Sequence, residues 1–212
     1  MAIIKQQQTI PIISYGQMNM QNDFRALTAQ MSILSGSYIT SIAAGFGNDA
    51  AIAGRLYGLP VKFIEKIQMA FGTPSMNALL HLLQMHVIYL ITLVNAMKTG
   101  DVESIDTNTA QLYRNADDIS ARFASINPFW DGVQWRNLLN SYIAMTIEEA
   151  ICVMAGNFEK HLDVCDRLLH HALFMGDYIA AGMLRYLSIT QRNAGIQRIQ
   201  ANLKKAKAAA RK

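Results

Sequence analysis

Long segments with a helical pattern, separated by short turns, fill the sequence between residues 21 and 191. Proline is absent between Pro74 and Pro128, which favours long helices there. We predict helices at 22–45, 49–57, 60–71, 76–98, 101–113, 115–125, 131–155, 157–175 and 177–203. Short turns place consecutive helices side by side and antiparallel. We therefore predict an all-α bundle or stack of antiparallel helical hairpins.

The turns recur at a regular distance along the chain. Gly100 and Gly156 lie 56 residues apart, and each follows a long apolar segment and precedes an amphipathic one. Pairs of large side chains at 56–57, 112–113 and 168–169 keep the same spacing. This pattern predicts a weak threefold repeat of helical hairpins.

The two ends of the chain differ from its centre in composition. Residues 1–20 contain β-branched side chains, Pro11 and Gly16 without a helical period, so we predict an extended arm. Residues 192–212 contain seven Lys or Arg residues and no acid, within a chain of net charge +4. The sequence thus divides into an arm (1–20), a helical bundle domain (21–191) and a basic Ala/Lys tail (192–212).

The basic tail is the region best suited to contact a partner. Its candidate partner-binding residues are Lys204, Lys205, Lys207, Arg211 and Lys212. Such charges attract phosphates, acidic lipids or an acidic protein surface. No aromatic side chains alternate with them, which argues against stacking on single-stranded nucleic acid. The alternative is a solvated end that only aids solubility.

Composition favours a reducing compartment. The chain has two cysteines, Cys152 and Cys165, which we interpret as small buried apolar side chains rather than a disulfide framework. No secretory signal pattern follows Met1. The segment 78–97 is long and apolar enough to cross a bilayer, but its histidines and amides are costly in hydrocarbon. We expect an intracellular protein or virion component that is neither secreted nor transmembrane.

Histidines are the candidate metal ligands. His81 and His86 are five residues apart, so they lie on different faces of a helix. A bundle could instead gather His86, His161 and His170, or the adjacent His171, around a cation, because imidazole is the commonest metal ligand. The interpretation that we favour is no metal site, with these histidines in ordinary hydrogen bonds, since the sequence lacks a metal-ligand spacing.

Motifs of catalysis are absent from the sequence. It contains no Glu-x-x-His pair of a di-iron bundle, no Gly-x-Ser-x-Gly and no nucleotide-binding loop. We therefore expect no catalytic residues, no cofactor, no small-molecule substrate and no enzymatic activity. Gly36-Ser37 indicates close helix packing. The aromatic segment 127–130 and Trp135 predict a plug at the end of the bundle.

Short motifs between residues 31 and 187 carry a family resemblance. They are Leu83-Gln84-Met85-His86-Val87, Leu93-Val94-Asn95-Ala96, Gly100-Asp101, Tyr113-Arg114-Asn115-Ala116-Asp117-Asp118-Ile119, Ser125-Ile126-Asn127-Pro128-Phe129-Trp130, Trp135, Glu149-Ala150, Ala172-Leu173, Met175 and Asp177. In these the chain resembles a bacterial family of uncharacterised small all-helical proteins, often mislabelled acetylglutamate kinase or glycosyltransferase. Two family histidines have no counterpart here, since this chain has Leu34-Ser35-Gly36-Ser37-Tyr38 at the first place and Ser141 or Tyr142 at the second. Only His86 matches.

A non-enzymatic structural or adaptor protein is the function we expect. Charged residues make up only 16% of the chain, which predicts a surface covered by partners. The arm and the tail would contact other subunits of an assembly, for instance as a minor capsid or internal virion component of a large DNA virus. One alternative is a small-ligand or metal-binding helical protein with a site near His86. Another is nucleic-acid or membrane attachment through the tail.

Overall fold

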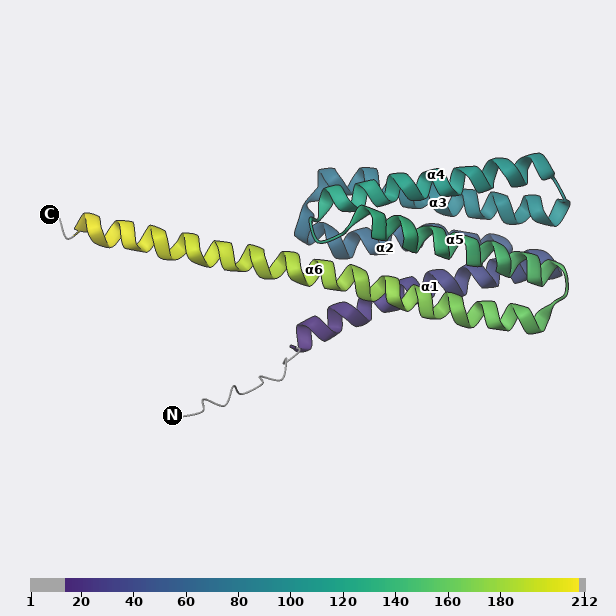
Figure 1. Cartoon of the computed structure of the whole chain (residues 1–212), viewed down its shortest axis with the longest axis horizontal. Helices are drawn as coiled ribbons and strands as arrows, with labels where there is room; N and C mark the ends of the chain where they lie inside the picture. Colours follow the sequence, from purple (N-terminus) through teal and green to yellow (C-terminus); the bar gives the residue numbers. More distant parts are fainter. Residues whose placement is uncertain (1–13, 210–212) are drawn as a thin grey trace, which may run out of the picture.

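Six α-helices make up nearly all of the computed structural model, which describes residues 14–209 (Figure 1). The side chains of residues 73–75 and 205–209 lie outside that description. The helices are α1 (Tyr15–Ala44), α2 (Asp49–Phe71), α3 (Thr73–Thr99), α4 (Val102–Ile126), α5 (Gly132–Met154) and α6 (Phe158–Ala209). No strand occurs in the described range, so the predicted all-α class is confirmed there.

Consecutive helices pack against each other, and α6 returns to pack along α1. This closes the bundle, with the pairs α1–α2, α3–α4 and α5–α6 as successive hairpins (Figure 1). The arrangement agrees with the predicted hairpin bundle. The threefold repeat itself stays a prediction, because similar connectivity does not establish that the three hairpins are equivalent.

Glycine and short polar side chains set the hairpin turns. Gly100 and Gly156 have φ values of 71° and 72°, a left-handed conformation that other residues rarely adopt. After each glycine a capping side chain starts the next helix: Asp101 and Asn157 each accept a hydrogen bond from the N–H three residues further on. Asn48 also follows a glycine but makes no capping bond, because its amide oxygen accepts from the Ser41 hydroxyl instead.

Three predicted helix breaks are wrong, because tertiary packing overrides local propensity. Pro60 lies buried inside α2, which continues through it. Asn115 lies inside α4 and directs its side chain to His86 and the α3 backbone. Gly176 lies inside α6 where a Cβ atom would come 2.7 Å from the backbone nitrogen of Arg25. At this position glycine serves the close approach of α6 to α1 rather than a turn.

The predicted arm needs correction within the described residues, and the predicted tail is an extension of the last helix. Residues 15–20 belong to α1, whose first turn is fixed by a capping box at Ser14. The Ser14 N–H donates to Gln17 Oε1 over 2.8 Å, and the Gln17 N–H donates to Ser14 Oγ over 3.2 Å. The extended arm is thus wrong for these residues, and residues 1–13 lie outside the described ones. The basic tail continues α6 without a break as far as Ala209, and residues 210–212 are again outside.

Aromatic side chains fill the region where α2, α4, α5 and α6 meet. Trp130 and Trp135 are each 1% exposed, and Phe123 stacks on Trp135 with ring centroids 4.3 Å apart. The Trp130 indole lies over Gly182, a position where any Cβ atom would collide with it. The prediction that these rings belong to the core is confirmed.

One helix in the described part of the chain is long and apolar enough to cross a membrane, the segment Met76–Thr99 of α3. About a third of this segment is buried within the bundle. Core helices also have this length and composition, so the finding is weak evidence for a membrane span.

Candidate metal centre

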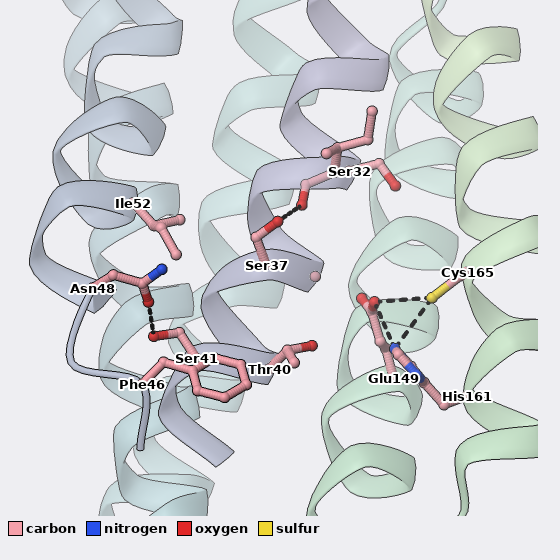
Figure 2. Close-up of a pocket in the computed structure, with 12 residues that line it drawn as sticks. Ser32, Ser37, Thr40, Ser41, Phe46, Asn48, Ile52, Glu149, His161 and Cys165 are labelled. Carbon is pink, nitrogen blue, oxygen red and sulfur yellow. Dashed lines mark hydrogen bonds and ion pairs between the residues drawn. The ribbon is translucent and has the colours of Figure 1, made fainter. Parts of the chain in front are cut away.

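Three side chains with metal-binding atoms converge where α5 and α6 face each other. Glu149 comes from the last turns of α5, and His161 and Cys165 from the first two turns of α6 (Figure 2). The turn at Gly156 folds α6 back along α5, which brings Glu149 opposite them. His161 and Cys165 are four residues apart, so they project from the same face of the helix.

The distances between the three ligand atoms are close to those around a tetrahedral ion, and the two distances to sulfur are a few tenths of an ångström shorter. His161 Nε2 lies 3.2 Å from Cys165 Sγ and 3.5 Å from Glu149 Oε1, and Cys165 Sγ lies 3.3 Å from Glu149 Oε1. Zinc bonds of roughly 2.0–2.3 Å at tetrahedral angles separate such ligands by about 3.3–3.6 Å. Within the described residues, this is the one group of three His, Cys, Asp or Glu side chains gathered closely enough to hold a metal.

Glu149 is the most deeply buried member, with an exposure of 2%. It faces α1 at Gly36, where a Cβ atom would lie 2.5 Å from Oε1. Glycine at this position therefore gives the carboxylate its space, in agreement with the close packing predicted there. The second oxygen, Oε2, is buried without a hydrogen-bond partner. A buried acceptor left unsatisfied costs roughly 1–3 kcal/mol, and a cation would remove that cost.

Protonation of the metal-free cluster follows from this burial. Burial raises the pKa of Glu149 above its usual range, although the Cys165 and His161 contacts oppose the shift. Burial, reinforced by the negative charge of Glu149, raises the pKa of Cys165 to about 12. Cys165 is therefore a thiol at neutral pH and donates its proton to Glu149 Oε1. A bound metal would displace protons from these ligands, so its affinity must rise with pH.

The same geometry argues against a cysteine nucleophile. In a nucleophilic triad the acid binds one imidazole nitrogen and the nucleophile binds the other. Here Glu149 and Cys165 both approach Nε2 of His161. A thiol with a raised pKa is also a poor nucleophile, since the thiolate is the reactive form. The three groups converge on a point, as ligands do.

Ion pairs on the outer side of the hairpin hold the two helices in register. Glu148 accepts from Arg167 over 2.7 Å and from Lys160 over 3.1 Å. The hydrogen bond from Arg167 contributes most to lowering the pKa of Glu148. These contacts join α5 to the first turns of α6 beside the cluster. Glu148 and Glu149 are thus sequence neighbours with opposite environments.

A pocket of about 430 Å³ opens beside the cluster. Glu149, His161 and Cys165 line one side, while hydroxyl-bearing residues of α1 and the Phe46–Ile52 region line the other (Figure 2). No Lys or Arg contributes to this lining. An ion held by three protein ligands would have its fourth position available to water or a small molecule from this pocket.

The histidine grouping predicted from the sequence is not what the structure forms. His86 is buried and its Nδ1 bonds Asn115 Oδ1 over 2.9 Å, away from the cluster. His170 Nδ1 donates to the backbone oxygen of Asp166, and His171 Nε2 donates to that of Leu138. Of the predicted ligands only His161 belongs to a metal-type group. The others are hydrogen-bonded histidines, as in the interpretation that we favour from the sequence.

Two ligands escaped the sequence analysis. Cys165 was interpreted as a buried apolar side chain, which holds for Cys152 but is wrong for the partly exposed Cys165. The available signal was the four-residue spacing of His161 and Cys165, an arrangement that metal sites favour on helices. Glu149 carried no local signal, because only the α5–α6 hairpin and Gly36 of α1 place it there.

The candidate partner-binding residues of the tail fall at the far end of α6. Lys204 is exposed on that helix. Lys205 and Lys207 lie within the helical range, but their side chains are outside the description. Arg211 and Lys212 lie beyond the described residues. None of the described ones is near the metal-type cluster at the beginning of the helix.

Comparison with known proteins leaves the chain without an assigned relative. No protein-family model, no curated protein and no solved structure matches it. The bacterial family resemblance expected from the short motifs therefore stays a prediction.

Proposed function

We propose that this protein binds a zinc-class divalent metal through Glu149, His161 and Cys165, and presents it to a small ligand in the adjacent pocket. The observation that carries the proposal is the convergence of three ligand atoms of different chemistry at separations of 3.2–3.5 Å. A Cys/His/Glu set combines the sulfur, nitrogen and oxygen donors that Zn²⁺ accepts. This function belongs to the metal-binding class expected as an alternative, at a different place from His86.

The environment of Glu149 supports a metal rather than a purely structural cluster. Its Oε2 is buried without a partner, whereas a structural carboxylate at this depth is normally fully hydrogen-bonded. Three protein ligands are also one fewer than structural zinc sites use. The remaining position faces a pocket with room for a small molecule. These features favour a site with an exchangeable ligand.

Metal titration of the chelator-stripped, untagged full chain tests the proposal. We expect one tight site for Zn²⁺, measured by competition with a chromophoric chelator. Replacing Zn²⁺ by Co²⁺ should give the absorption of a tetrahedral site with a thiolate-to-cobalt charge-transfer band. Cys165→Ser should remove that band and weaken binding by about 100-fold, because the soft thiolate ligand is lost.

Matched variants distinguish the cluster from other cysteines and histidines. Cys152→Ser alters the other cysteine, and His170→Gln alters an exposed histidine that bonds only to the backbone. Both should bind Zn²⁺ like the unmodified chain. Equal Zn²⁺ affinity in Cys165→Ser, or a cobalt complex without the thiolate band, would refute the assigned ligands.

A structural or adaptor function in a larger assembly, including the virion setting, stays a prediction. No relative or structural neighbour bears on it. The feature that supports attachment to something else is the part of α6 that extends past the bundle (Figure 1).

A further inference from the structure

The C-terminal part of α6 extends away from the bundle as a single helix (Figure 1). We call residues 188–209 the projecting segment. Met183 is the last buried side chain of α6, and every residue described from Ser188 to Lys204 is exposed except the half-exposed Gly195. At 1.5 Å per residue the projecting segment is roughly 33 Å long.

The intrinsic helical stability of the projecting segment is low. Three isoleucines and Gly195 have lower helix propensity than alanine, and an isolated helix of this length is marginal in water. Stability in such helices normally comes from packing of an apolar face. The described part of the chain offers no such packing to the projecting segment. The segment is therefore suited to a surface outside the bundle.

Its side chains divide into two faces along the helix. The apolar side chains follow spacings of seven, three and four residues and so form one stripe: Ile189, Ile196, Ile199 and Leu203. All four are substantially exposed, between 44% and 62%. Arg198 and Lys204 lie off this stripe, toward the other side of the helix. The segment is thus amphipathic, with an apolar stripe that Arg192 interrupts at one position and a cationic polar side.

Charge along this region has one sign. Asp177 is the last acidic residue of the chain, and the 35 residues after it contain eight Lys or Arg. A helix with an apolar face and Lys or Arg on its polar face is the form that lies in the interface of an anionic membrane. There the apolar stripe enters the acyl boundary while the cations meet lipid phosphates and carboxylates.

We propose that the projecting segment docks on the surface of an anionic lipid bilayer. Nucleic acid would meet the charges but leave the isoleucine stripe in water. A coiled coil with a second copy needs apolar positions sustained over three or four heptads. Here the stripe covers about two heptads, and Arg192 occupies the intervening inner position. Of these three surfaces, only the lipid bilayer uses both faces of the helix.

Vesicle flotation with the full chain tests this proposal. Vesicles of phosphatidylcholine with phosphatidylserine should carry the protein, vesicles of phosphatidylcholine alone should not, and raised salt should weaken the binding. Ile196→Asn should lower the partition coefficient by about tenfold because it removes one apolar anchor from the stripe. Arg198→Glu should lower it by a similar factor through charge reversal. Both residues are exposed, so neither change should unfold the bundle.

Control variants separate lipid docking from nonspecific adsorption and from self-association. Ala201→Asn alters a small exposed residue off the stripe and should leave partitioning unchanged. Cys165→Ser should also bind vesicles normally, because the metal-type cluster lies at the other end of α6. Equal binding to neutral vesicles would overturn the proposal. So would full binding by Ile196→Asn, or a dimer in solution that Ile196→Asn dissociates.

Discussion

Two histidine clusters in this bundle differ in their burial and in how their polar atoms are paired. At the first, His86 Nδ1 meets Asn115 Oδ1, and the Asn115 amide donates to the Leu82 carbonyl over 3.0 Å. At the second, His161 and Cys165 meet Glu149, whose Oε2 has no partner. The first cluster is a continuous chain of hydrogen bonds between α3 and α4. In the second cluster, one carboxylate oxygen of Glu149 is left without a hydrogen-bond partner.

This difference separates a structural polar group from a candidate binding site. Burial lowers the pKa of His86, which keeps the imidazole neutral and suits it to a neutral amide partner. Burial raises the pKa of Glu149, so the ionised carboxylate is less stable here than in water. A metal would supply the missing positive charge at the second cluster. At the first cluster it would have to displace existing bonds.

The largest expected effect on stability comes from disrupting the His86–Asn115 cluster. His86→Ala should lower the free energy of unfolding by about 3 kcal/mol, because it creates a cavity and leaves Asn115 buried without its partner. Cys165→Ser should change the stability of the metal-free protein by less than about 1 kcal/mol, since the site is only partly buried. Urea denaturation of both variants measures the contrast. A reversed order would mean that the two roles are assigned the wrong way round.

An intermediate effect is expected from filling the space beside Glu149. Gly36→Ala places a methyl group against Oε1, so the carboxylate must shift and Zn²⁺ affinity should fall by about tenfold. Gly58→Ala is the matched control, because its Cβ atom would meet open space within α2. Competition titration with a chelator compares the two variants. Unchanged affinity in Gly36→Ala would show that the position of Glu149 is not critical.

The smallest expected effect is a pair of opposite pH dependences in the metal-free protein. His86 has a lowered pKa in the fold, so stability is lost as pH falls below the usual histidine value of about 6.5. Glu149 has a raised pKa, so stability is lost as pH rises from about 4.5 through the raised value. Glu149→Gln should remove the second loss and stabilise the metal-free chain by about 1 kcal/mol at neutral pH. Unfolding curves recorded at pH values from about 4 to about 8 measure how the free energy of unfolding changes with pH in both ranges. A Gln variant that keeps the same loss toward high pH would contradict the assignment to Glu149.

The helical class could be predicted from the sequence because the apolar periodicity and the glycine turns are local properties. The same local reasoning placed breaks at Pro60, Asn115 and Gly176, where the structure has continuous helices. At each position the residue serves a contact with another helix or the core, which a single sequence does not display. Ser14 shows the reverse case, since its capping box with Gln17 was present in the sequence but the nearby Pro11 and Gly16 suggested an extended arm.

The candidate site was only partly predictable. His161 was a candidate because histidine is a common ligand, but the grouping with His86 and His170 was wrong. The four-residue spacing to Cys165 is a local signal that the sequence does contain. Glu149 joins them from another helix, so its role depends on the register of the α5–α6 hairpin.

The sequence by itself determined the all-α class, the hairpin turns at Gly100 and Gly156, and the concentration of positive charge after Asp177. These follow from spacing and composition, which act over a few residues. Only the tertiary structure decided which buried polar side chains have hydrogen-bond partners and which retain an atom without one. Burial and hydrogen-bond partners arise between helices far apart in the chain, as where Gly36 of α1 makes room for Glu149 of α5.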